Sequence, residues 1–217
     1  MADSANDKAD WDAAAPFRWA TWPVASMLAF VALVHGAWWL FGDTVVHYGN
    51  LADSDGYARL LRVERLIETG DWLDSSLPGA NAPYGGSLHW TRLFDVMLIA
   101  LALPLMPLLG VKAALYWSGA MISPLLHLGT AATLAWAAMP LIGRAATLVA
   151  GGLTATQFGV LGYATIGHAD HHMLLGLIAV AAFGFAVAVA ARRSRRRRAQ
   201  PDASAWVVRW PRSGAAG

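Results

Sequence analysis

The sequence contains no cysteine in its 217 residues. A disulfide framework and a thiolate metal site are therefore excluded, and the redox compartment of the protein cannot be inferred. Charged residues are also scarce: they make up 14% of the chain, against 57% hydrophobic residues, and the mean hydropathy is +0.43. A soluble domain rarely has this composition, which is typical of a protein that crosses a membrane several times.

The few charges are unevenly distributed, so the net charge of +2 says little by itself. Six of the sixteen basic residues lie within residues 192–198, directly after a long apolar segment. A basic run can bind nucleic acid, but in this position it is typical of the cytoplasmic end of a transmembrane helix. We therefore expect a membrane, and no nucleic acid, as the partner of this region. Residues 192–217 are interpreted as a basic, disordered cytoplasmic tail.

Five apolar stretches follow residues 1–19, which we interpret as a cytoplasmic tail before an uncleaved signal-anchor helix. The stretches are residues 20–41, 93–109, 111–139, 145–166 and 173–191. Four of them are long enough to span a bilayer. The stretch 93–109 is the shortest and contains Pro104 and Pro107, which indicates an interfacial or re-entrant segment.

The positions of the arginines decide between two topologies. If residues 93–109 span the membrane, the basic run lies opposite the N-terminus, outside the cytoplasm. If they are interfacial, the N-terminus, Arg144 and the basic run all lie inside, as the positive-inside rule favours. The sequence thus predicts an all-α, polytopic protein of the inner (plasma) membrane. It has about four spanning helices, a cytoplasmic N-terminus and a large external loop over residues 42–110.

The external loop carries a first acidic motif at residues 53–57, Asp-Ser-Asp-Gly-Tyr. A predicted amphipathic helix follows over residues 56–69, stops at Gly70 and bears a basic stripe of Arg59, Arg62 and Arg65. A carboxylate in this motif can bind a divalent metal or take a proton from a hydroxyl. Capping of the helix by Asp53, Ser54 and Asp55 is an equally good explanation of the cluster.

Asp170 forms a second acidic motif, because it is the only acidic residue between Val96 and Gln200. An ionisable group at the edge of a membrane segment is costly and usually marks a functional site. His168 and His172 are four residues apart and would share a helical face, a spacing that permits a metal pair. Asp170 can instead cap a helix starting near His172, although capping does not explain the neighbouring histidines. Two isolated histidines, His35 and His127, are interpreted as packed or interfacial.

Both motifs face outside in the predicted topology, where two carboxylates brought together suit a magnesium or manganese site. Residues 54–57, Ser-Asp-Gly-Tyr after a first transmembrane helix, resemble the first acidic motif of the oligosaccharyltransferase catalytic subunit. Residues 167–174, Gly-His-Ala-Asp-His-His-Met-Leu, resemble the second acidic motif of that family. The order of helices and motifs over residues 20–193 is also similar, and it is the architecture of the C-type (GT-C) glycosyltransferases.

The resemblance implies transfer of a sugar from a polyprenyl-phosphate-linked donor to an external acceptor. Asp55 matches the catalytic and metal-binding aspartate of the first motif, and Asp170 matches a metal ligand of the second. His172 stands where the family has a second acidic residue, which suits manganese or zinc better than magnesium. Arg59 and Arg62 would contact the phosphate of the lipid-linked donor, or alternatively lipid headgroups.

Enzymes of this type contain more helices and a further external loop, so the chain resembles the N-terminal part of such an enzyme. We therefore expect little activity from the isolated chain, and a second subunit is one possible partner. The alternative function is a non-enzymatic membrane subunit or transporter fragment whose His/Asp cluster binds a metal or protons.

Overall fold

Three long helices dominate the computed structural model, which describes residues 21–199 and the side chains of residues 21–194. They are α2 (Trp22–Phe41), α6 (Val111–Ile142) and α9 (His172–Ala199). By length and composition, α2, α6 and residues His172–Ser194 of α9 can each cross a membrane. The chain is thus all-α, as predicted, with three helices long and apolar enough to span a bilayer.

The predicted span over residues 145–166 is not one continuous helix. It is divided into α7 (Arg144–Leu153), the 3-10 turn η2 (Thr154–Thr156) and α8 (Phe158–Ala164), with a bend of 65°. A side chain at Gly151 would lie 2.4 Å from Sδ of Met27, so the glycine lets α7 approach α2 closely. The hydroxyl of Thr154 donates to the carbonyl of Gly151 and competes with the regular helical pattern.

The stretch 93–109 forms no single helix long enough to span a bilayer, and its predicted interfacial or re-entrant position stays a prediction. It contains α4 (Arg92–Ala102) and the short α5 (Met106–Leu109), separated by a turn. Pro107 lies in the first turn of α5, where its missing N–H costs no helical hydrogen bond.

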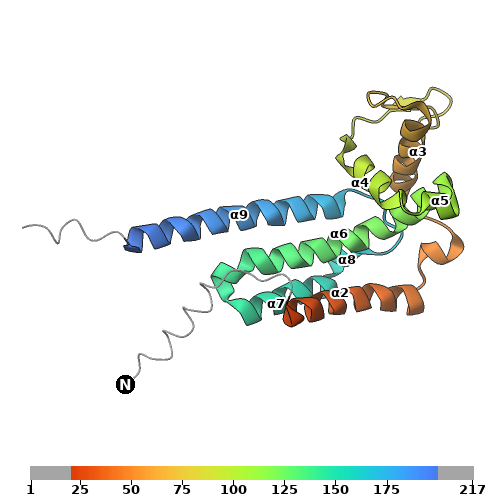
Figure 1. Ribbon diagram of the computed structural model, residues 1–217. Helices are drawn as coiled ribbons and strands as arrows, with labels where there is room; N and C mark the ends of the chain where they lie inside the picture. Colours follow the sequence, from red (N-terminus) through yellow and green to blue (C-terminus); the bar gives the residue numbers. More distant parts are fainter. Residues whose placement is uncertain (1–20, 200–217) are drawn as a thin grey trace, which may run out of the picture.

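The helices run in alternating directions, so their ends form two faces (Figure 1). The start of α2, the end of α6, the start of α7 and the end of α9 lie at one end of the bundle. The opposite end carries η1 (Val45–Tyr48), α3 (Ser54–Thr69), α4 and the start of α9.

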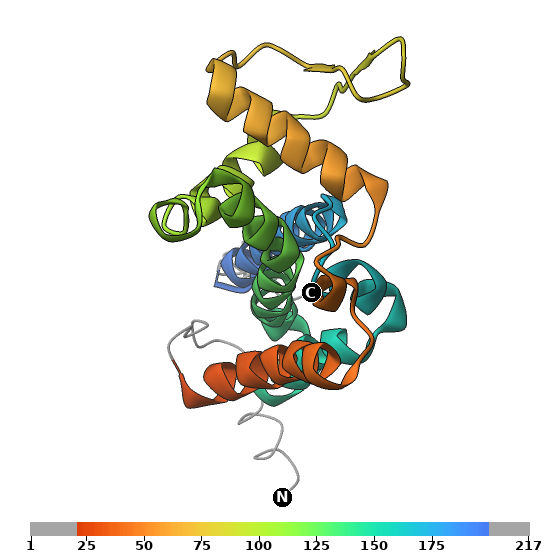
Figure 2. The same ribbon diagram turned by 90° about the vertical axis from the view of Figure 1, so that its right-hand side faces the viewer.

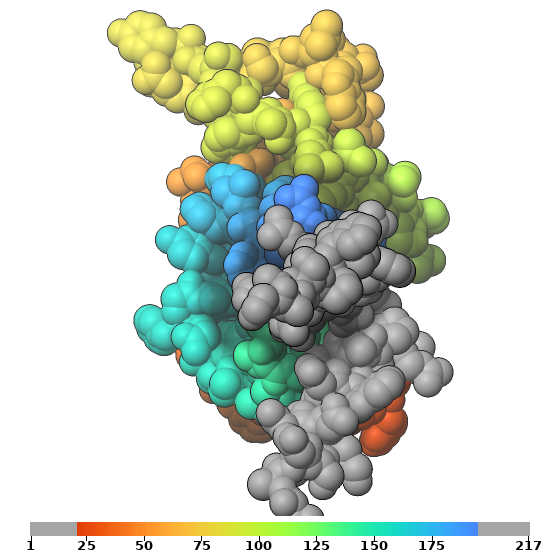
Figure 3. Space-filling model, turned by 90° about the vertical axis from the view of Figure 1, so that its left-hand side faces the viewer, coloured from red at the N-terminus to blue at the C-terminus, as the bar shows by residue number. Residues whose placement is uncertain are grey.

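Helix α3 lies crosswise to the long helices, over the end of the bundle (Figure 2). Asp53 is its N-cap, and Gly70 ends it with a φ of 68°, as the glycine stop predicted. The following loop contains a two-residue antiparallel pair, β1 (Ser76–Leu77) with β2 (Gly86–Ser87). This loop projects sideways beyond the bundle (Figure 3).

Helix α6 is the centre of the molecule, because α2, α3, α4, α7, α8 and α9 all pack against it. The largest buried cluster joins residues of α3, α4, α6, α8 and α9, among them Val63, Phe94, Leu126 and Met173. This cluster packs beneath α3, at the end of the bundle that carries α4 and the start of α9.

Helix α9 continues through the arginine run to Ala199, so the prediction of a disordered tail starting at residue 192 is wrong for residues 192–199. Arginine is a good helix former, and the run follows an established helix without Gly or Pro. The predicted tails over residues 1–19 and 200–217 lie outside the described residues.

Candidate metal centre

The two acidic motifs pack directly against each other at the end of the bundle. The N–H of Ala52 donates to the carbonyl of Gly167 at 3.0 Å. A side chain at Gly56 would lie 3.3 Å from Cβ of Ala169, so the start of α3 rests on the second motif with little space between them. The N–H of Gly167 in turn donates to the carbonyl of Ala120, which anchors the second motif on α6.

Asp53 is the residue of the first motif that faces the second. Its Oδ1 accepts from the N–H of Gly56 at 2.7 Å, so the capping interpretation holds for Asp53. Its Oδ2 lies 3.7 Å from Nδ1 of His168. Asp55, by contrast, is exposed in the first turn of α3, where a negative charge interacts favourably with the helix dipole. It makes no hydrogen bond or ion pair with any described residue.

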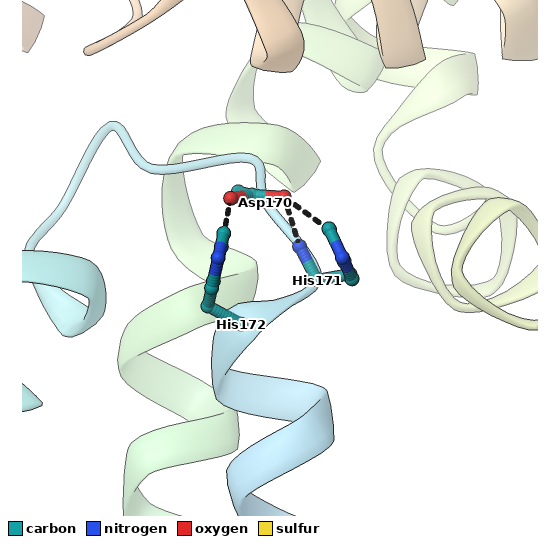
Figure 4. A group of neighbouring side chains, drawn as sticks. All are labelled: Asp170, His171 and His172. Carbon is teal, nitrogen blue, oxygen red and sulfur yellow. Dashed lines mark hydrogen bonds and ion pairs between the residues drawn. The ribbon is translucent and has the colours of Figure 1, made fainter. Parts of the chain in front are cut away.

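Asp170 gathers two imidazoles around one carboxylate (Figure 4). Asp170, His171 and His172 each offer a ligating atom, and these atoms all lie within 4.8 Å of one another. The N–H of His171 is 2.6 Å from Oδ1 of Asp170, and Nδ1 of His171 is 2.5 Å from the same oxygen. Nδ1 of His172 lies against Oδ2. Among the described residues this is the one cluster with the composition of a metal site.

Asp55 is not a member of this cluster, so the structure does not bring the predicted metal ligand Asp55 together with Asp170 and His172. His168 is also absent, because α9 begins only at His172 and residue 168 precedes the helix. The expected helical pair of His168 with His172 is therefore wrong. Asp170 does not cap α9 either: its carboxylate binds the N–H of the next residue, whereas an N-cap binds two or three residues on.

Arg59 reaches the cluster from α3, with its side chain 2% exposed. Its Nη2 lies 2.8 Å from Nδ1 of His171 and 3.8 Å from Oδ1 of Asp170. A guanidinium can only donate, so Nδ1 of His171 must present a lone pair to it. That same nitrogen then cannot donate to the carboxylate 2.5 Å away. Nδ1 of His171 has a single lone pair, so a cation bound there would displace the Arg59 N–H, and the two compete for this nitrogen.

The environment of Asp170 stabilises its charged form. Burial acts to raise the pKa of Asp170, but the hydrogen bond from the His171 N–H and the adjacent rings of His171 and His172 outweigh it, so the pKa is lowered. Burial likewise lowers the pKa of Arg59, opposed by the attraction of Asp170 and, more weakly, of Asp55. Both residues therefore remain charged at neutral pH.

Arg62 makes a second buried ion pair one turn along α3. Its Nη2 lies 3.0 Å from Oδ2 of Asp95, which is 0% exposed, and donates to the carbonyl of Trp90. Arg92 shares the same carboxylate oxygen at 3.1 Å. Burial raises the pKa of Asp95, whereas Arg62 and Arg92 act to lower it. Arg59 and Arg62 are thus internal cations, not members of an exposed basic stripe.

Two features of the site were missed by the sequence analysis. His171 was not assigned as a ligand, although it directly follows Asp170 and this proximity was visible in the sequence. The stacking of Tyr163 on the ring of His172, with centroids 4.5 Å apart, had no sequence signal. It depends on the bend between α7 and α8.

No known protein family, no curated protein and no solved structure matches this chain. The functional argument therefore depends on the residues of the site and their arrangement.

Proposed function

We propose that this protein belongs to a membrane glycosyltransferase system of the GT-C type. It acts in transfer of a sugar from a polyprenyl-phosphate-linked donor to an acceptor outside the membrane. The observation that carries the proposal is the cluster of Asp170, His171 and His172, seated directly against the first acidic motif. The two motifs that resemble the glycosyltransferase elements come from distant parts of the chain and are in contact.

A divalent metal suits the cluster because one carboxylate and two imidazoles favour manganese or zinc over magnesium. Three protein ligands leave coordination positions open, as in catalytic sites. His171 is half-buried and His172 exposed, so the cluster can be reached from one side. When bound there, the metal would neutralise charge on a phosphate leaving group.

The remaining chemistry is assigned to α3. Asp55 is exposed and unpaired among the described residues, so its carboxylate is free to accept a proton from an acceptor hydroxyl. Arg59 and Arg62 would provide positive charge toward the phosphate. Nε of Arg59 and both Nε and Nη1 of Arg62 are buried without a hydrogen-bond partner among the described residues, so the cover over them would have to move before they could bind an anion.

An apolar cavity near the arginines supports the proposal that the donor is lipid-linked. It has a volume of about 410 Å³ and lies between α4 and α6, lined by Met97, Ala100, Leu101, Ile122, Leu125 and Leu126. Phe94, against which Arg59 packs at 4.8 Å from the ring centre, is one helical turn before Met97 on α4. The cavity would hold part of the hydrocarbon chain while the phosphate remains near the arginines.

The proposed topology has four crossings, counting the bent pair of α7 and α8 as one, in the inner (plasma) membrane. The N-terminus and Arg144 then lie in the cytoplasm, and α3 and the cluster lie outside. A second subunit would supply helices that complete the enzyme.

One observation favours the alternative, a non-enzymatic membrane subunit or transporter fragment with a metal or proton site. Arg59 already neutralises Asp170, and Asp53 already caps α3, so both motifs have structural roles.

The test uses membranes of the source cells with chromosomal substitutions, so that any partner is present. We expect Asp55→Ala to lower divalent-metal-dependent sugar transfer from the lipid-linked donor by about a hundredfold or more. Glu68→Ala, which removes an exposed carboxylate from the other end of α3, should leave transfer unchanged. Transfer that is equal in the two variants would exclude Asp55 as base or ligand and favour the alternative.

A further inference from the structure

Two histidines inside the helical bundle meet at the break between α7 and α8. His127 of α6 is 0% exposed and His35 of α2 is 5% exposed. Nε2 of His35 lies 2.9 Å from Nδ1 of His127, and Nε2 of His127 lies 3.0 Å from Oγ1 of Thr154 in η2. Ionisable groups at such positions in a membrane protein are rare and commonly functional.

The hydroxyl of Thr154 fixes the direction of this chain of hydrogen bonds. It donates its single hydrogen to the carbonyl of Gly151 at 2.7 Å, so it must accept from His127. His127 therefore carries its hydrogen on Nε2 and presents a lone pair at Nδ1. His35 must in turn donate from Nε2, which leaves a lone pair on its own Nδ1. That atom is buried and has no hydrogen-bond partner among the described residues.

We propose that His35, His127 and Thr154 form a proton-sensitive latch that holds the α7–α8 break against α2 and α6. The latch accepts one proton, at Nδ1 of His35, because every other ring nitrogen is already engaged. A proton from the solvent adds to this lone pair, no bond within the protein breaks, and the two histidines together gain one positive charge.

That charge has no counter-charge nearby. We consider the elements that form the latch and the break: α2, α6, α7, η2 and α8. Apart from the two histidines, their titratable or charged side chains are Lys112 and Tyr116 on α6, Arg144 on α7 and Tyr163 on α8, and α2 and η2 have none. None is an acid that would be negative near neutral pH. The immediate surroundings are Val31, Ala131 and Ala155. A cation in such surroundings is strongly unfavourable, so protonation shifts the break toward an open arrangement that hydrates the histidines.

Opening of the latch would reach the candidate metal centre through α8. This helix starts shortly after Thr154 and carries Tyr163, whose ring stacks on His172. The latch itself does not depend on the proposed glycosyltransferase function, because it is defined by α2, α6 and η2 alone.

The first measurement is ¹⁵N NMR of histidine-labelled full-length chain in detergent micelles, with signals assigned by His35→Gln and His127→Gln. We expect both rings to be neutral with hydrogen on Nε2 at neutral pH, and acidification to add one proton at Nδ1 of His35 first. A His127 ring with hydrogen on Nδ1, or independent protonation of the two rings, overturns the proposal. The wild-type chain suffices for this readout.

The second measurement exploits the absence of native cysteine. Ala155→Cys reports the buried side of η2 (2% exposed), and Leu153→Cys, at 50% exposed on the same turn, corrects for the effect of pH on the thiol. The ratio of their reaction rates with a small permeant thiol reagent should rise about tenfold on acidification, equivalent to about 1.4 kcal/mol.

Three background substitutions complete the thiol test. With His35→Gln the ratio should be independent of pH, because glutamine cannot take up the proton. With Thr154→Val it should be high at every pH, whereas Thr154→Ser should behave as wild type. A pH-independent ratio in the wild type, or an unchanged pH response with His35→Gln, overturns the latch.

Discussion

Nη2 of Arg59 lies 2.8 Å from Nδ1 of His171, although the two residues are 112 positions apart in the chain. Arg59 comes from the second turn of α3, and His171 directly precedes α9. The contact ties α3 to the residue before α9 at the point where the candidate ligands gather. It also places a permanent positive charge beside them, so metal binding at the cluster and the position of Arg59 are coupled.

The first prediction concerns metal binding by the purified full-length chain. Manganese or zinc should bind to the cluster, and Asp170→Asn or His172→Ala should weaken binding by about a hundredfold or more, beyond the usual loss from changing a neighbour of a ligand. His89→Ala, which removes an exposed histidine outside the cluster, is the control. Calorimetric titration measures the affinities, and equal affinity in all variants would exclude the site.

A second prediction follows from the position of Arg59. Arg59→Met should tighten metal binding, because the competing charge beside His171 and Asp170 disappears. The same variant should be less stable without metal, since Asp170 loses its buried counter-charge. Thermal unfolding in detergent, with and without metal, measures both effects. Weaker metal binding in this variant would show that Arg59 supports the site and does not compete with it.

The third prediction concerns the buried ion pair of Arg62 with Asp95. Asp95→Ala should destabilise the chain by about 3–5 kcal/mol, because Arg62 is left buried without its partner. The double variant Arg62→Met with Asp95→Leu should recover most of this loss. Asp43→Ala, at an exposed carboxylate, is the matched control and should change the free energy of unfolding little.

The fourth prediction separates the neighbouring acids of the first motif. Asp53→Ala should cost about 1 kcal/mol of stability because the N-cap of α3 is lost, whereas Asp53→Ser keeps a capping oxygen. Asp55→Ala should have a smaller effect on stability, since it removes only a favourable interaction with the helix dipole. A larger loss of stability with Asp55→Ala than with Asp53→Ala would contradict the assignment of Asp53 as the N-cap.

The fifth prediction tests topology with single cysteines and an impermeant thiol reagent. Ser54→Cys and Gly162→Cys are at exposed positions near the two motifs, and Arg193→Cys is exposed near the end of α9. The first two should react from outside in intact cells, and Arg193→Cys only after permeabilisation. Ala169 is unsuitable as a reporter because it is fully buried. Labelling of only one of the first two positions would contradict a shared outer face.

The helix content could be predicted because long apolar segments in a bilayer must satisfy their backbone hydrogen bonds internally. The stop of α3 at Gly70 was predictable for a local reason, the left-handed conformation that glycine adopts easily. The break at Thr154 was not, because residues 145–166 read as one apolar run. It depends on the close approach of Gly151 to Met27 on another helix.

The candidate site divides in the same way. Asp170 was identifiable from the sequence alone, because a single carboxylate in a long apolar region is energetically expensive wherever it lies. Its partners were not, since Arg59 appeared to belong to an exposed stripe and His168 to a helical metal pair. The composition and local patterns of this chain determined that it forms long apolar helices and where its rare charges occur. Only the tertiary structure decided which charges meet, because the ion pair between Arg59 and Asp170 depends on how α3, α6 and α9 pack and not on the spacing within any of them.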